Sequence, residues 1–96
     1  MRTIRYTKQF KRDYKREKSG KSRQHAKALD DLLMEAVRLL ASDSPLPAAT
    51  RDHPLGGTWK DHRDCHIRPD LVLIYRKPDS VNLDLVRLGS HSELGL

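Results

Sequence analysis

The sequence has a single cysteine, Cys65, and no long apolar stretch. One thiol cannot form an intramolecular disulfide, so the cysteine content gives no indication of an oxidising compartment. No apolar run approaches the roughly 20 residues that a membrane-spanning helix needs. The basic N-terminus is not followed by the apolar segment of a secretory signal. These absences predict a cytoplasmic protein with no membrane partner.

Aromatic residues are also scarce, at 5% of the chain, whereas charged residues make up 33%. The hydrophobic core must therefore be built mainly from leucine and valine. A length of 96 residues is enough for one modest core and too short for two. We therefore expect a single domain over residues 1–96.

Positive charge is concentrated at the start of the chain. Residues 1–27 contain eleven Lys and Arg against two acidic residues, a net charge of +9. The remaining 69 residues contain eight against eleven, a net charge of −3. Such asymmetry is typical of proteins that contact nucleic acids or anionic membranes. A solvated helix face that only keeps the protein soluble would have the same composition, so charge alone leaves both interpretations open.

The first helix is predicted from Lys8 to about Lys18, with Thr7 as its N-cap. Only Phe10 and Tyr14, four residues apart, are available for burial on this helix. The other sides are covered by lysine and arginine, so we expect a shallow contact with the fold and a basic flank. A break at residues 19–22 follows.

A second helix is predicted from this break to about Ser42. Its apolar residues recur at intervals of three and four, which indicates one buried stripe. The stripe consists of Leu29, Leu32, Leu33, Ala36, Val37 and Leu40. Leu39 falls outside it. The prolines at positions 45 and 47 prevent the helix from continuing.

Alternating or unbroken apolar residues predict four strands. A short first strand spans Arg2–Tyr6, and a second spans Trp59–Arg68. The unbroken apolar run Leu71–Tyr75 is typical of a central strand buried on both faces. The last strand, Val81–Leu88, has apolar residues at alternate positions.

The strand at residues 59–68 is expected to have two different faces. One face carries Trp59, Cys65 and Ile67. The other is a row of titratable and cationic residues: Lys60, His62, Asp64, His66 and Arg68. Asp61 and Arg63 are in phase with the apolar face and make the pattern imperfect.

Four of the five histidines lie between Asp52 and His91. Two hairpins in this region would bring together one set of polar residues: His53, His66, Asp70, Arg87 and His91. Each has a structural explanation when taken singly, because titratable residues are common in turns and tails. Their convergence beside a basic helix is what favours a catalytic site.

General acid/base chemistry fits these residues better than metal or nucleotide binding. The spacing of His62 and His66 occurs in zinc sites, but no second cysteine is present and Cys65 would point the other way. Gly56 and Gly57 lack the spacing of a phosphate-binding loop. Histidine exchanges protons near neutral pH, and RNA cleavage needs a base, an acid and cations near the phosphate. We therefore predict no metal and no cofactor.

Several short motifs occur in a specific order over nearly the whole chain. They are Asp52-His53-Pro54-Leu55, Trp59-Lys60, Arg63-Asp64-x-His66, Pro69-Asp70, Leu73-Ile74-Tyr75 and Arg87-x-Gly89-x-His91. In these motifs the sequence closely resembles the YafQ branch of the RelE/ParE toxin superfamily. The resemblance implies an α+β fold of order β-α-α-β-β-β, with a helical hairpin packed on a twisted antiparallel sheet. It also implies an endoribonuclease that cuts translated mRNA in the ribosomal A site and is inhibited by a cognate antitoxin.

The resemblance also implies roles for individual residues. The catalytic positions match His53, His66, Asp70 and His91, with His91 as the general acid, Asp70 as the base and the other two assisting. Contacts with RNA phosphates are expected from a basic set: Arg87, Lys60, Arg63, Lys11, Arg12 and Lys15. Family members often have Trp after the position of Asp70 and Phe near the C-terminus, where this sequence has Leu71 and the pair Gly95-Leu96.

Two other functions are compatible with the same resemblance. One is a ParE-like toxin that binds a protein target without cutting RNA. The other is a ribosome-binding protein without catalytic activity, which would account for the basic helix. Neither accounts for the set of histidines, so the sequence favours the nuclease.

Overall fold

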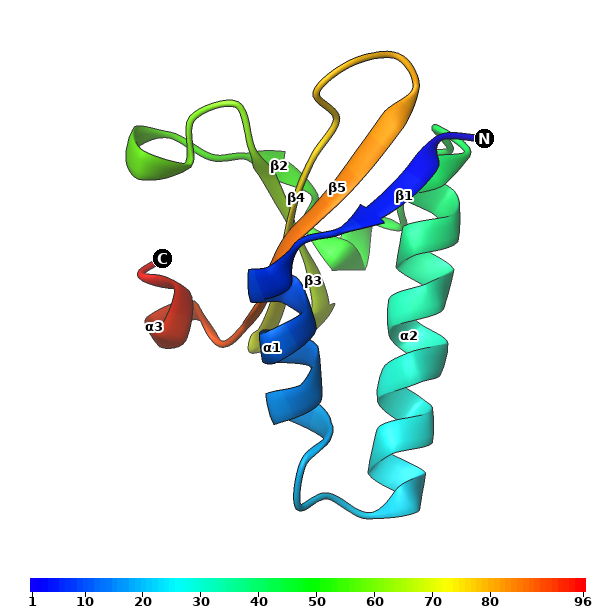
Figure 1. Cartoon of the computed structure of the whole chain (residues 1–96), viewed down its shortest axis with the longest axis vertical. Helices are drawn as coiled ribbons and strands as arrows, with labels where there is room; N and C mark the ends of the chain where they lie inside the picture. The colour runs from blue at the N-terminus through cyan, green and yellow to red at the C-terminus, as the bar shows by residue number, and fades with distance from the viewer.

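The computed structural model describes all residues from Met1 to Leu96. The helices and strands follow one another in a single mixed order (Figure 1). They are β1 (Thr3–Tyr6), α1 (Lys8–Lys18), α2 (Arg23–Ala41), the 3₁₀ helix η1 (Ala48–Thr50), β2 (His53–Pro54), the 3₁₀ helix η2 (Gly57–Trp59), β3 (Arg63–Arg68), β4 (Leu71–Arg76), β5 (Asn82–Gly89) and α3 (His91–Leu94). The predicted α+β class and helical hairpin are confirmed. The short β2 and α3 are additions to the predicted order.

The five strands form one sheet with the order β1-β5-β4-β3-β2. The sequence predicted an antiparallel sheet, but the pairing of β1 with β5 is parallel, with Ile4 opposite Leu83. All other pairs are antiparallel. The first strand of the chain therefore lies beside the last. This pairing places the start of α1 next to the end of β5.

The helices α1 and α2 are formed and capped by short local signals. Thr7 accepts a hydrogen bond from the N–H of Phe10 at 3.2 Å, which confirms it as the N-cap of α1. Ser22 caps α2 in the same way through the N–H of His25. Neither helix is long and apolar enough to cross a membrane, and the same holds for α3.

The apolar stripe of α2 is confirmed with one exception. Its members pack against the sheet and are buried, apart from Leu32, which is 45% exposed. Leu32 lies at the exposed edge of the stripe. Ala41, which was not part of the predicted stripe, is buried at the end of the helix.

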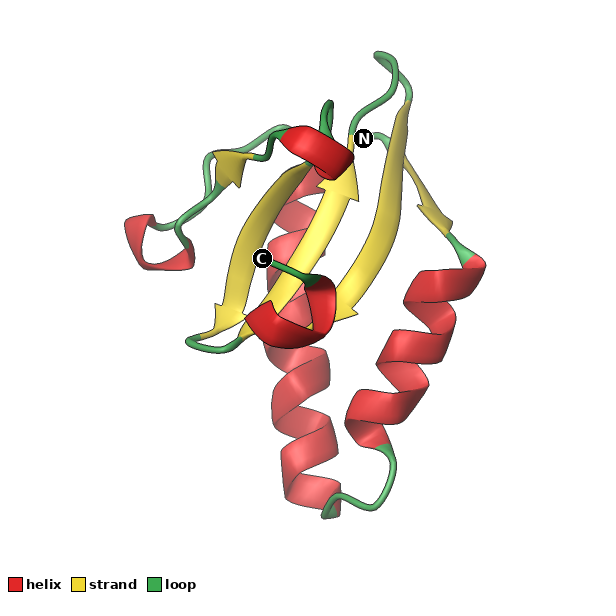
Figure 2. Cartoon of the chain, turned by 90° about the vertical axis from the view of Figure 1, so that its left-hand side faces the viewer, coloured by secondary structure: helices red, strands yellow, loops and turns green.

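The sheet is covered on both faces (Figure 2). Against α1 and α2 it presents the larger cluster, which includes Cys65, Leu73 and Leu85. On the opposite face, Val72 and Ile74 pack against Leu94 of α3. All residues from 71 to 75 are buried, so the predicted central strand is confirmed.

The strand predicted at residues 59–68 is four residues too long. Trp59 ends η2, and β3 begins only at Arg63. The chain turns between them because Asp61 has left-handed backbone angles, with a φ of 68°. Trp59 consequently does not share a face with Cys65, as predicted. It packs on the opposite face of the sheet, against the cluster of Val72, Ile74 and Leu94.

Candidate active site

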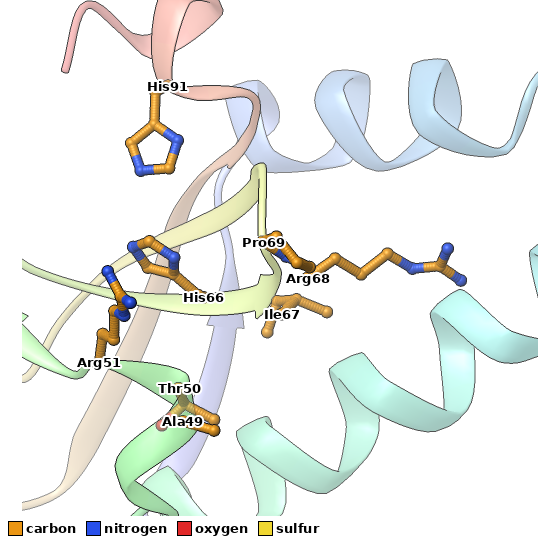
Figure 3. A pocket seen from close by; sticks show the side chains of 8 residues that line it. All are labelled: Ala49, Thr50, Arg51, His66, Ile67, Arg68, Pro69 and His91. Carbon is orange, nitrogen blue, oxygen red and sulfur yellow. The ribbon is translucent and has the colours of Figure 1, made fainter.

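A cavity of about 550 Å³ lies where β3, the turn after β3 and α3 meet the end of η1. His66 enters it from β3 and His91 from the first position of α3 (Figure 3). The centroids of the two imidazole rings are 4.9 Å apart, and the rings are inclined at 64°. Two residues that are 25 positions apart in the sequence thus line the same cavity.

His91 is held by a short helix whose ends are both fixed. Ser90 and Glu93 form a reciprocal capping box at its start, and Gly95 ends it in the left-handed conformation. Leu94 is buried against the sheet. Gly89, which precedes the N-cap, is in a tight position, because a Cβ there would lie 3.0 Å from Arg16 Nη2 and 3.3 Å from Glu93 Oε1. No helix was predicted from the sequence at this position.

Asp70 contacts His91 through two atoms of that residue. Its Oδ1 accepts a hydrogen bond from the backbone N–H at 3.0 Å and lies 2.7 Å from the ring Nδ1. The hydrogen bonds from the ring and the backbone of His91 lower the pKa of Asp70. The carboxylate is therefore anionic at neutral pH and leaves Nε2 of His91 free for other partners.

His53 lies beside this group and does not line the cavity. In β2 it is paired with Asp64 of β3. Its Nδ1 is hydrogen-bonded to the carbonyl of Arg51 at 2.7 Å and lies 3.0 Å from Oδ1 of Asp64. Because the hydrogen bond of this nitrogen goes to Arg51, Oδ1 of Asp64 has no hydrogen-bond partner.

Asp64 is a buried carboxylate within the histidine cluster. Only 2% of the residue is exposed. Burial raises the pKa of Asp64, while the charges of His53, His66 and His91 act to lower it. Asp64 was not predicted as a site residue. Its signal was its place two residues before His66, on the titratable face of the same predicted strand.

Arg87, expected at the phosphate, does not line the cavity. Its Nε donates to Asp13 Oδ2 of α1 at 2.7 Å. Asp13 is buried and also accepts hydrogen bonds from the N–H of Leu88 and from Arg16. Burial alone would raise the pKa of Asp13, but the hydrogen bonds from Arg87 and Leu88 and the two guanidinium charges lower it. The guanidinium of Arg87 thus has a permanent anionic partner.

The other predicted cations differ in whether they form an ion pair within the protein. Arg63 forms an ion pair with Asp52 at 3.2 Å, and Asp52 also accepts a hydrogen bond from the hydroxyl of Tyr75. Lys60 is exposed at the end of η2 and has no ion pair. Three exposed residues of α1 also have no ion pair: Lys11, Arg12 and Lys15. We call them the α1 cations.

Arg51 is a second residue that was not predicted. It follows η1, lines the cavity and is exposed. A single arginine before a turn has no pattern that distinguishes it in the sequence. Its position becomes apparent only when η1 is placed against β3.

The motifs that carry this site also match a family model. Residues 2–95 match the model described as the bacterial toxin of type II toxin-antitoxin system, YafQ. The chain belongs to the YafQ toxin family. A relative from Escherichia coli K12, named mRNA interferase toxin YafQ, is 39% identical over 93 residues, which are 97% of this chain and 95% of the relative. A Haemophilus influenzae relative, named putative toxin YafQ, is 36% identical and covers 97% of this chain and 91% of its own length.

Solved structures of YafQ toxins share the fold. YafQ from E. coli BL21(DE3) superposes with a TM-score of 0.81 at 34% identity, covering 98% of both chains. YafQ in the E. coli DinJ-YafQ complex has a TM-score of 0.80 at 35% identity, with the same coverage. A metal-bound toxin from Helicobacter pylori has a TM-score of 0.79 at 45% identity and covers 98% of this chain and 99% of its own.

Proposed function

We propose that this protein is the toxin of a type II toxin-antitoxin pair and a ribosome-dependent endoribonuclease of the cytoplasm. It cleaves translated mRNA in the A site without a metal ion. The observation that carries the proposal is that His66 and His91 line one cavity, with Asp70 bound to the ring of His91. The E. coli relatives are named mRNA interferase toxin YafQ, which supports the same chemistry.

In the proposed reaction, His91 is the general acid. Asp70 holds Nδ1 of the ring at 2.7 Å and fixes the orientation of the imidazole. Nε2 then carries the proton that is given to the departing 5′-oxygen. A carboxylate on the far nitrogen also stabilises the protonated ring by its negative charge.

His66 is the base that best suits this geometry, assisted by His53. The family resemblance implied Asp70 as the base, but a carboxylate that has a lowered pKa and is already hydrogen-bonded to His91 is a poor proton acceptor. The His66 ring lines the same cavity and has no hydrogen bond to the protein. Asp70 therefore acts as the residue that orients the acid.

The bond changes balance without a further reactant. His66 takes the proton of the ribose 2′-hydroxyl, and the 2′-oxygen forms a bond to phosphorus. The bond from phosphorus to the 5′-oxygen breaks, and His91 gives its proton to that oxygen. The products are a 2′,3′-cyclic phosphate on the upstream fragment and a free 5′-hydroxyl on the downstream fragment.

Replacement of His91 by glutamine tests the assignment. His91→Gln should lower the cleavage rate about 10²- to 10⁴-fold, because the proton donor is lost. Ribosome binding should stay within about twofold, since the fold and the α1 cations are unchanged. The measurement is single-turnover cleavage of mRNA on programmed ribosomes. His25→Gln, on α2 away from the cavity, is the matched control and should cleave like the wild type.

A substrate with a 2′-deoxy sugar at the scissile position provides the second test. It lacks the attacking oxygen, so the wild-type protein should leave it uncut. Full activity of His91→Gln, or cleavage of the deoxy substrate, would contradict the mechanism. Ribosome binding by the wild type without any cleavage would instead support the non-catalytic binding function.

An antitoxin is the second partner of the proposal. The E. coli relative forms a complex with DinJ. We expect the antitoxin of this protein to carry an acidic or flexible segment that covers the basic surface, because opposite charge accelerates association. Recovery of such an inhibitor by pull-down from the host would support this partner.

A further inference from the structure

Cleavage of RNA in this cavity requires a cation that the sequence did not identify. Asp64 and Asp70 place two carboxyl groups next to the histidines, and the reacting phosphate gains negative charge in the transition state. In such a site a preorganised cation is usually a large part of the stabilisation. Arg87 was expected to supply it, but Asp13 neutralises that guanidinium outside the cavity.

Two arginines line the cavity, Arg51 and Arg68. Figure 3 shows the Arg51 side chain beside the ring of His66, whereas the Arg68 side chain runs away from both histidines. The guanidinium of Arg51 makes no ion pair or hydrogen bond with the protein, and the residue is exposed. The guanidinium of Arg68 is also unpaired, with its Nε buried, but it points away from the histidines. Arg51 is therefore the unpaired cation that lies beside His66.

The backbone of Arg51 is held in an uncommon conformation. Its φ of 50° and ψ of 44° lie in the left-handed region, which costs free energy for a residue with a side chain. Two contacts maintain it. The N–H donates to the carbonyl of Ala48 at 3.1 Å, and the carbonyl is bonded to the ring of His53 at 2.7 Å. One of the predicted site histidines thus fixes the segment from which Arg51 extends.

We propose that Arg51 binds the non-bridging oxygens of the scissile phosphodiester between His66 and His91. This inference rests on the proposed nuclease function and identifies the phosphate-binding residue of that site. The planar guanidinium can contact two phosphate oxygens at once, which a single ammonium group cannot do. On this proposal His53 is a positioning residue, because its ring is hydrogen-bonded to the carbonyl of Arg51.

The first experiment measures binding of inorganic phosphate to the free protein, from the NMR signals of the His66 and His91 rings. Wild-type protein should bind phosphate between the two rings. Arg51→Gln should weaken that binding by about tenfold or more, because a charge-assisted pair of hydrogen bonds is lost. Arg51→Lys should be intermediate. Arg23→Gln, which removes an exposed and unpaired arginine of α2, should bind like the wild type.

The second experiment measures single-turnover cleavage on ribosomes. Arg51→Gln should cleave on the order of 10²-fold more slowly while its ribosome affinity stays within about twofold, since the contact strengthens as charge develops on the phosphate. Arg51→Lys should recover part of the rate, which loss of fold would not allow. Melting curves of the free variants exclude unfolding.

The two arms separate the inference from the function on which it rests. A wild-type protein that cuts no RNA would refute the nuclease function, and the phosphate titration would still decide the role of Arg51. Absence of phosphate binding in the wild type, or equal binding by Arg51→Gln, would overturn the assignment. Loss of cleavage in Arg87→Gln with full activity in Arg51→Gln would return the role to Arg87.

Discussion

The carboxylate of Asp13 connects α1 to the end of β5, so its replacement tests how much this contact stabilises the fold. It is 2% exposed and accepts hydrogen bonds from three groups. These are Nε of Arg87 at 2.7 Å, the N–H of Leu88 at 2.9 Å and Nη1 of Arg16 at 3.0 Å. Replacement by alanine would remove all three acceptor contacts at once.

The cost of Asp13→Ala can be estimated from the surroundings of its partners. Removing one member of a buried ion pair typically costs 3–5 kcal/mol. The side chains of Arg87 and Arg16 are 23% and 43% exposed, so water can partly replace the lost contacts, which places the cost near the lower limit. We expect about 3 kcal/mol in free energy of unfolding, or about 12–24 °C in Tm for a chain of this size. Asp13→Asn keeps an acceptor for Leu88 and should cost about 2 kcal/mol.

The pH dependence of the free energy of unfolding provides a second test of the same interaction. Because the pKa of Asp13 is lowered in the folded protein, its stabilising contribution is complete above the unfolded pKa of about 3.9. It is lost as the pH falls through the lower, folded pKa. The difference in stability between the wild type and Asp13→Asn should therefore be constant from pH 5 to 7 and shrink below about pH 4.

Urea denaturation at each pH, followed by circular dichroism, measures these differences. Asp31→Ala is the matched control, because Asp31 forms an exposed i,i+4 pair with Lys27 at 3.0 Å. Such pairs contribute about 0.3–0.5 kcal/mol. If Asp13→Ala were no less stable than Asp31→Ala, or if the effect of Asp13→Asn grew at low pH, the reasoning would be refuted.

Two further predictions concern the core and the basic surface. Leu33→Asp should cost several kcal/mol by burying an unpaired charge, whereas Leu32→Asp on the exposed edge of the stripe should cost little; equal urea midpoints would contradict the packing of α2. Neutralising the α1 cations should flatten the dependence of log Kd for ribosomes on log salt concentration, by about 0.7–0.9 per lost phosphate contact. An unchanged slope would show that these residues only solvate the helix.

Elements with a strong local signal could be predicted from the sequence. The α2 stripe and the β4 run are long or unbroken enough that periodicity determines both type and buried face. Thr7 was predictable because an N-cap depends on residues within one helical turn. The helix α3 has an equally local signal, the Ser90-x-x-Glu93 capping box, although no helix was predicted there.

Contacts between distant residues could not be predicted in the same way. The partner of Arg87 lies 74 residues away in the sequence, so nothing near Arg87 indicated that its charge was already neutralised. The start of β3 depends on the left-handed conformation of Asp61, which an alternation pattern does not contain. The parallel pairing of β1 is likewise a property of the assembled sheet. The family resemblance identified which residues belong to the site, but their contacts came from the structure.

The pairing of β1 with β5 has a consequence for the folding of the protein. The first strand finds its partner only when the last strand is available, and closing a loop of this length costs entropy before the contact can form. The start of α1 depends on the same strand, because the hydroxyl of Thr7 donates hydrogen bonds to the carbonyls of Leu85 and Val86, and Asp13 accepts one from the N–H of Leu88. A chain in which β5 has not formed therefore lacks both the edge of the sheet and the contacts that hold α1.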